Sequence, residues 1–185
     1  MSVEDLLKSA VKISDGQKAD GKKIAMAYQA VQHGEAVSGF ERLFSAFETE
    51  VAAHAYSRWE GYFAASLLAY NARQSSKATE AVFDRAAILA QDHFNALQRQ
   101  AVLVPNFEVK STDAEIARGA RFGEAMLNAL TNMVQETGID REQSYFAIAL
   151  LTITLRTDAP ANCGGATLFD AASTAAWDYY QKHAS

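Results

Sequence analysis

The sequence predicts an all-α fold, a single compact bundle of about six to seven helices that spans residues 1–185. Three observations support this prediction. Alanine, which has the highest helix propensity, occurs 36 times, whereas proline occurs only at Pro105 and Pro160. A length of 185 residues is typical of one domain. Apolar residues also recur at helical spacing between signals that mark where helices begin and end.

Helix starts are marked by a short polar residue three positions before Glu or Gln, which is the spacing of a capping box. This spacing occurs at Ser38–Glu41, Thr112–Glu115 and Asp140–Gln143. Helix ends are predicted at Gly34, Pro105 and Gly138, because glycine favours the left-handed cap conformation and proline cannot continue a helix. These signals delimit seven expected helices, at residues 3–13, 21–33, 39–73, 77–103, 113–137, 141–156 and 166–183.

The predicted helix at 39–73 is unusually long. Its apolar residues, from Phe40 to Tyr70, follow an almost continuous three-and-four spacing. At a rise of 1.5 Å per residue, an unbroken helix would measure about 50 Å, which is more than a compact domain of this size readily holds. We therefore expect a kink or break close to Gly61.

Two of the later helices carry distinctive packing signals. In the helix at 113–137, Gly119 and Gly123 lie one turn apart on the apolar face, where the missing side chains would let a neighbouring helix approach closely. The helix at 141–156 includes the run from Tyr145 to Ile153, which is apolar nearly all round. Because a helix without a polar face belongs inside a domain, we expect this helix to lie at the centre of the bundle.

Charge and composition exclude several classes of function. The formal net charge is −5, which argues against nucleic acid as a partner because nucleic-acid-binding proteins usually present a basic face. The single cysteine rules out an intramolecular disulfide framework, and no apolar stretch is long enough for a membrane span. Residues 1–9 lack the basic and apolar regions of a signal peptide, so we expect a cytoplasmic protein.

Familiar catalytic and cofactor motifs are missing from the sequence. It contains no Gly-rich phosphate loop after a strand, no Gly-x-Ser-x-Gly and no His-Glu-x-x-His. The two Glu-x-x-His motifs of di-iron bundles are missing as well. We therefore expect neither a metal nor a cofactor, and the sequence favours a role other than catalysis.

Aromatic residues exceed what one core requires, and this excess motivates the leading hypothesis. Tyr and Trp combine an apolar body with a polar tip, which suits a protein interface. Six aromatic residues are predicted to form a partner-binding surface: Tyr56, Trp59, Tyr62, Phe63, Trp177 and Tyr180. The chain is therefore expected to be an interaction module that acts as a regulator, adaptor, inhibitor or assembly subunit. Its partner would be another protein or a second copy of the chain.

Two alternatives depend on Cys163, Gly164 and Gly165, which directly precede the last predicted helix. In one, the bundle encloses a small apolar ligand or cofactor that contacts these residues or His93. In the other, Cys163 is the nucleophile of an enzyme, since a thiolate is stabilised at a helix N-terminus. Against both stands the simpler interpretation that Cys163 fills a small space as an inert residue and that His93 bonds a nearby carbonyl or hydroxyl.

Overall fold

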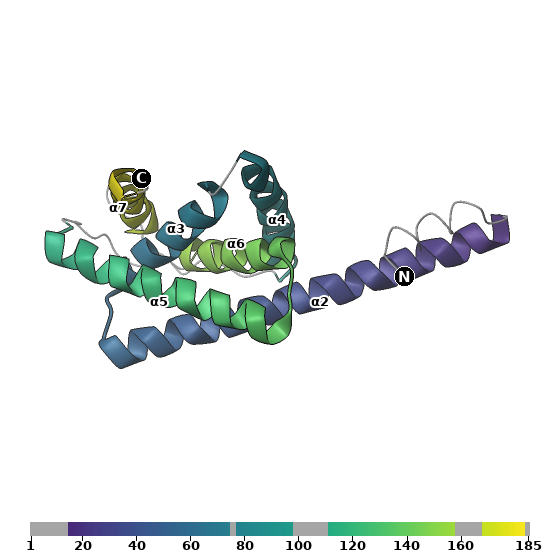
Figure 1. Ribbon diagram of the computed structural model, residues 1–185, viewed down its shortest axis with the longest axis horizontal. Helices are drawn as coiled ribbons and strands as arrows, with labels where there is room; N and C mark the ends of the chain where they lie inside the picture. Colours follow the sequence, from purple (N-terminus) through teal and green to yellow (C-terminus); the bar gives the residue numbers. More distant parts are fainter. Residues whose placement is uncertain (1–14, 75–76, 98–110, 158–167, 184–185) are drawn as a thin grey trace. The chain divides into compact units, whose positions relative to one another are not determined.

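Six helices make up the described part of the chain in the computed structural model, which covers residues 15–74, 77–97, 111–157 and 168–183 (Figure 1). For residues 15–28 and 77–80 only the backbone is described. The helices are α2 (Asp15–His54), α3 (Arg58–Gln74), α4 (Lys77–Ala96), α5 (Asp113–Thr137), α6 (Arg141–Thr157) and α7 (Leu168–His183). These ranges contain no strand, and the all-α prediction is confirmed.

The chain divides into two units, Met1–Glu35 and Ala36–Ser185. The first unit holds the beginning of α2. The second holds the remainder of α2 and the five later helices, which pack into a compact bundle. The extent of one domain over residues 1–185 stays a prediction.

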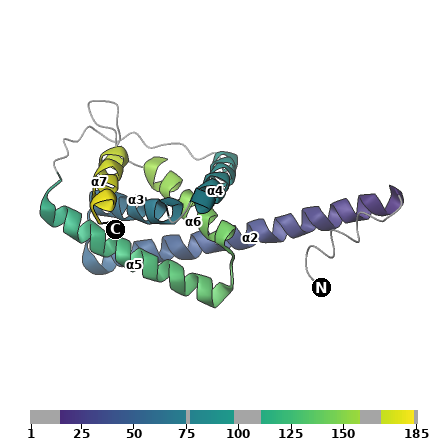
Figure 2. The same ribbon diagram turned by 45° about the horizontal axis from the view of Figure 1, so that its top comes forward.

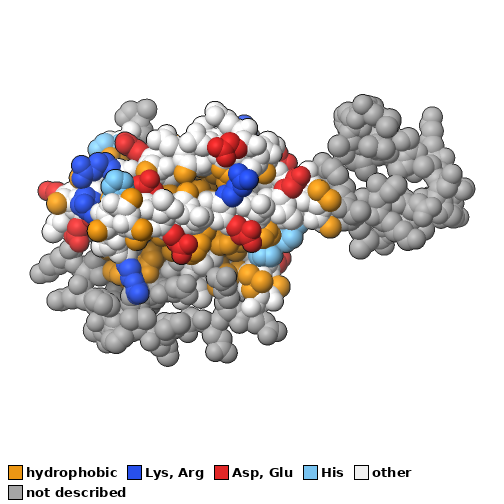
Figure 3. All heavy atoms as spheres, turned by 90° about the horizontal axis from the view of Figure 1, so that it is seen from below, with side chains coloured by type: hydrophobic (Ala, Val, Ile, Leu, Met, Phe, Trp, Pro, Cys, Tyr) orange, Lys and Arg blue, Asp and Glu red, His pale blue; other side chains and the backbone are white. Residues whose placement is uncertain are grey.

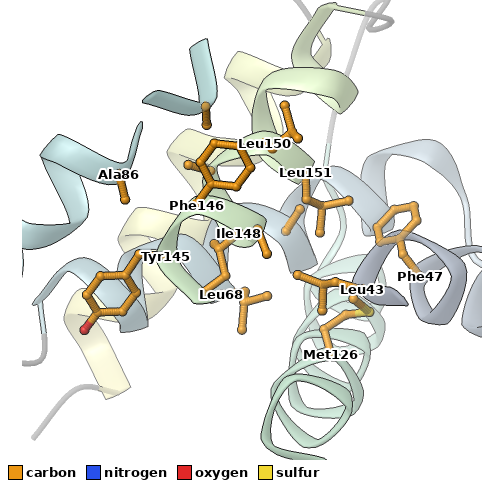
Figure 4. Close-up of a cluster of buried hydrophobic side chains, with 14 of the residues drawn as sticks. Leu43, Phe47, Leu68, Ala86, Met126, Tyr145, Phe146, Ile148, Leu150 and Leu151 are labelled. Carbon is orange, nitrogen blue, oxygen red and sulfur yellow. The ribbon is translucent and has the colours of Figure 1, made fainter. Parts of the chain in front are cut away.

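Helix α6 is the central helix of the bundle, as its apolar sequence predicts. Every residue from Gln143 to Leu151 is buried, and Ile148 and Leu151 have no exposed surface. Figure 4 shows side chains of α6 surrounded by side chains from the other helices: Leu43 and Phe47 of α2, Leu68 of α3, Ala86 of α4 and Met126 of α5. Burying a Leu or Ile side chain contributes roughly 1.5–3 kcal/mol, so α6 organises the main core.

Helix α3 is buried as completely as α6, and it separates two hydrophobic clusters. Its residues from Trp59 to Leu68 are all buried. Ala64, Ala65 and Leu68 belong to the main core around α6. The second cluster lies between α3, α5 and α7, and its buried members are Trp59, Tyr62, Phe63, Leu67, Ala120, Phe169, Ala172 and Ala176. The ribbon in Figure 2 shows α7 beside α3.

The two glycines of α5 lie against α3, as their spacing predicts. A Cβ atom added to Gly119 would lie 2.7 Å from Phe63 Cδ1, and one added to Gly123 would lie 3.0 Å from Leu67 Cδ2. The first distance is shorter than a van der Waals contact permits, and Phe63 has no exposed surface toward which to move. The close approach of α3 and α5 therefore depends on glycine at these positions.

Helix α5 begins and ends where the sequence predicts. Helix α6 also begins at its predicted position. Thr112 and Glu115 form a capping box before α5, and Gly138 ends α5 with φ 70° and a hydrogen bond from its N–H to Val134 O. At the start of α6, Gln143 N donates to Asp140 Oδ1 (2.9 Å) and Asp140 N donates to Gln143 Oε1 (2.7 Å).

Three predicted boundaries in the first half of the chain differ from the structure. Helix α2 continues through Gly34 and Ser38, so neither residue ends or starts a helix. The neighbouring Gly39 serves packing, since a Cβ there would lie 3.1 Å from Ile139 Cδ1. The expected break at Gly61 instead lies at residues 55–57, between α2 and α3. Gly61 is inside α3, where its missing side chain makes room for the ring of Phe47. A Cβ atom added to Gly61 would lie 2.8 Å from Phe47 Cζ.

Candidate functional site

Helix α7 presents two of its aromatic side chains beside Tyr70 of α3. The ring centroids of Tyr70 and Trp177 are 5.1 Å apart, and those of Trp177 and Tyr180 are 5.8 Å apart with nearly parallel planes. The hydroxyl oxygens of Tyr70 and Ser173 are 2.8 Å apart and share a hydrogen bond. All three rings are partly buried. We call Tyr70, Trp177 and Tyr180 the aromatic patch.

The other four predicted partner-binding residues lie elsewhere, and three of them are not at the surface. Trp59 and Tyr62 are each 5% exposed and Phe63 is fully buried, so the expectation that they face outward is corrected. They spread around α3 because that helix is covered on two sides, and α7 supplies Phe169 to this cluster. Trp59 Nε1 has no hydrogen-bond partner among the described residues, so Trp59 contributes there by apolar packing.

Tyr56 lies in the link between α2 and α3, where its ring contacts two residues of α5. It stacks on Phe122 with a centroid distance of 4.5 Å and an interplanar angle of 6°. The Tyr56 ring also contacts Arg118. The Cζ atom of Arg118 is 5.0 Å from the ring centroid, which is within range of a cation–π interaction. Tyr56 is therefore part of the structure of the link.

Arg118 and Glu60 form an ion pair between α5 and α3 that the sequence does not predict. Arg118 Nε donates to Glu60 Oε1 at 2.6 Å, and Arg118 Nη2 donates to the carbonyl oxygens of His54 (3.1 Å) and Ala55 (3.3 Å). The Glu60 side chain is 4% exposed, and Arg118 places the opposite charge beside it. The Ser57–Glu60 capping spacing was the signal that could have identified Glu60.

The hydrogen bond to Glu60 raises the pKa of Arg118 above its ordinary value, against a smaller opposing effect of desolvation. A raised folded-state pKa contributes stability that is present below the ordinary arginine pKa and is lost only as the pH rises through the higher folded value. The arginine therefore keeps its charge throughout the neutral range. Its contribution to folding does not change there.

A groove of about 590 Å³ lies between the start of α5 and the end of α7. Ile116, Ala120 and Tyr179 give it an apolar portion. Half of its twelve lining residues are ionisable, with both signs present: Asp113, Arg121, Glu124, Asp178, Lys182 and His183. Such a lining suits a polar ligand better than the apolar one that the sequence suggests.

Helix α4 and the residue that follows it carry the most exposed large apolar side chains described in the second unit. Ile88 is 63% exposed, Leu89 58% and Leu97 50%. The chain beyond Leu97, up to residue 110, lies outside the described residues. On the face of the molecule shown in Figure 3, hydrophobic side chains are visible in strips between scattered acidic and basic ones.

Of the residues proposed to hold a ligand, only His93 lies in the described part of the chain. It is partly buried, and its ring packs edge-on against Phe146 with a centroid distance of 5.9 Å. Cys163, Gly164 and Gly165 lie outside the described residues, and their proposed roles stay predictions. Among the residues that are described, no group of three or more His, Cys, Asp or Glu side chains is placed to hold a metal ion.

Within residues 15–74, 77–97, 111–157 and 168–183, none of the helices combines the length and apolar character needed to cross a membrane. No protein-family model, curated protein or solved structure matches the chain. Its function must therefore be argued from its own residues.

Proposed function

We propose that this chain is a helical protein-interaction module that binds its partner through the aromatic patch of Tyr70, Trp177 and Tyr180. The observation that supports this proposal is a row of three rings, with Trp177 in contact with the other two, that remain only partly buried. Trp and Tyr are the residue types most enriched among the side chains that dominate binding energy at protein interfaces. The patch retains Trp177 and Tyr180 from the predicted surface and adds Tyr70.

The rings of the patch are held in place before any partner arrives. Tyr70 is fixed by its hydrogen bond to Ser173, and Trp177 lies between Tyr70 and Tyr180. Ala172 and Ala176, both fully buried, seat α7 closely on α3. Ordering a flexible side chain on binding costs about 0.5–1.5 kcal/mol, and side chains that are already ordered avoid much of this cost.

The partner is another protein or a second copy of this chain, and the role is that of a regulator, adaptor, inhibitor or assembly subunit. We place this activity in the cytoplasm, because a chain with one cysteine has no intramolecular disulfide that would require an oxidising compartment. The alternative of a bound small molecule would use the groove between α5 and α7. Its mixed charges make it the less favoured proposal, since most small-molecule pockets are predominantly apolar.

The double variant Trp177→Ala/Tyr180→Ala tests the patch. We expect protein partners that the wild-type chain enriches in a pull-down to be enriched at least tenfold less by this variant. The matched control is Ile88→Ala/Leu89→Ala, which removes two exposed apolar side chains from α4 and should leave capture unchanged. Far-ultraviolet circular dichroism checks that both variants keep their helices. Equal capture by the folded patch variant would contradict the proposal.

A further inference from the structure

The link between α2 and α3 contains the capping box of Ser57 and Glu60, which starts α3, but no residue that would force α2 to end. Residues 40–60 contain neither glycine nor proline. Ala55 nevertheless has φ 50°, and it is the one non-glycine residue in the described ranges with positive φ. An L-residue in this left-handed conformation is strained, because its Cβ approaches the following carbonyl oxygen. The backbone of the link is therefore imposed on the sequence from outside.

Helix α5 supplies the contacts that impose it. Arg118 donates to the last carbonyl groups of α2, at His54 and Ala55, and to Glu60 of α3. Glu60 Oε2 in turn accepts from Ser57 N at 2.7 Å. If the Arg118–Glu60 pair were lost, His54 O and Ala55 O could accept instead from the N–H groups of Arg58 and Trp59, as in any α-helix. The two helices would then become one.

A continuous helix over residues 36–74 would measure about 58 Å, so its first half could no longer fold back on α5 and α6 of the same chain. The vacated surface would expose buried apolar side chains such as Ile139, which lies against Gly39. Residues 36–54 of a second copy match this surface completely. They would restore the Phe47–Phe122 contact (5.0 Å) and the Arg42–Glu136 ion pair (3.5 Å).

We propose that this chain forms a dimer in which two copies exchange residues 36–54, with α2 and α3 joined into one helix, and that the Arg118–Glu60 pair opposes the exchange. An exchanged dimer keeps every contact between α2 and the bundle and changes only the link. A short link with a strained residue is a known site for such exchange. The proposal is independent of the aromatic patch, which contains no residue of the link.

The first test compares Arg118→Ala with Arg121→Ala, a change of an exposed arginine one turn further along α5. Both proteins are refolded at high concentration, and their dimer fractions are measured by analytical ultracentrifugation. Arg118→Ala should raise the dimer fraction at least tenfold over wild type, and Arg121→Ala should leave it unchanged. Equal dimer fractions in both folded variants would overturn the proposal.

A cross-linking experiment distinguishes exchange from simple association. Arg42→Cys and Glu136→Cys are introduced together with Cys163→Ser, in the wild-type and Arg118→Ala backgrounds, and a short bis-maleimide joins the two new thiols. Because these positions face each other within the closed chain, a monomer yields only internal links. An exchanged dimer yields a covalent dimer on a denaturing gel. A dimer fraction that contains only internal links would refute the exchange.

Ala55→Gly keeps the test decisive if Arg118→Ala does not fold. Glycine relieves the strain at φ 50° and so favours the closed link. After refolding at the same high concentration, the Ala55→Gly dimer fraction should be at least threefold lower than that of wild type. An unchanged or larger dimer fraction, or no dimer in the wild-type protein at any concentration, would overturn the proposal.

Discussion

Two links of three residues join antiparallel helices in this bundle, and they are held by different means. Residues 138–140 join α5 to α6, and the groups that cap the two helices lie within a few positions of the link: Gly138 in the left-handed conformation and the Asp140–Gln143 capping box. Residues 55–57 join α2 to α3 and have Ala55 in the left-handed conformation instead. They are stabilised by the local Ser57–Glu60 capping box and by Arg118, which lies more than sixty positions away.

The comparison shows that two links of the same length can depend to different extents on contacts from other helices. The α5–α6 link forms from its own residues once the two helices form. The α2–α3 link combines its own capping box with contacts from Arg118 of α5, and its backbone is strained at Ala55. Stability measurements on the two links should therefore differ in size and in sign.

The largest effect is expected for Glu60→Ala. This change removes the partner of Arg118 and the acceptor for Ser57 N, in a position that is 3% exposed. We expect the free energy of unfolding to fall by about 2–3 kcal/mol, because the hydrogen bonds to the Glu60 carboxylate are lost and Ser57 N is left without its acceptor. Urea denaturation provides the measurement. Glu142→Ala, which breaks the exposed Arg85–Glu142 pair, is the control and should cost less than about 1 kcal/mol. Similar losses in both variants would mean that the Glu60 pair has no special role.

Gly138→Ala should have an intermediate effect confined to the α5–α6 link. Alanine at φ 70° is strained, and we expect a loss of about 1–2 kcal/mol in the free energy of unfolding. Gly138→Asn should cost less, because asparagine tolerates the left-handed conformation. Thermal unfolding of the two variants measures the difference. An alanine variant as stable as wild type would indicate that the left-handed cap is not needed.

Ala55→Gly should have the smallest effect and the opposite sign. Relief of strain should exceed the added entropy of the unfolded chain, so we expect a gain of about 0.5 kcal/mol. The same urea experiment measures it. A loss of about 1 kcal/mol, the usual result for glycine inside a helix, would mean that residue 55 is helical in solution and that α2 and α3 are already joined.

This contrast also explains which parts of the fold could be predicted. Thr112, Gly138 and Asp140 act on groups within a few residues, so α5 and the start of α6 could be recognised directly. The break after His54 carries one such signal, the Ser57–Glu60 spacing, but the contacts of Arg118 with His54 and Ala55 come from another helix and could not be predicted. Gly34 carries the sequence signal of a helix end, yet α2 continues through it.

The candidate site, too, could be predicted from the sequence only in part. The excess of aromatic residues is visible in the sequence, but their distribution between core and surface is not. Trp59 and Tyr62 are buried by α7, which follows them by more than a hundred positions, whereas Trp177 and Tyr180 of α7 remain partly exposed. An amphipathic pattern identifies the faces of a helix, and only packing decides which faces are covered.

The second hydrophobic cluster also sets the order in which the chain can fold while it is being made. Trp59, Tyr62 and Phe63 are synthesised about 110 residues before Phe169, which helps to bury them. Ribosomes add roughly 5–20 residues per second, so these rings wait about 5–20 s for α7. During that interval the nascent chain displays an aromatic surface that the finished bundle conceals, and chaperones bind surfaces of that kind.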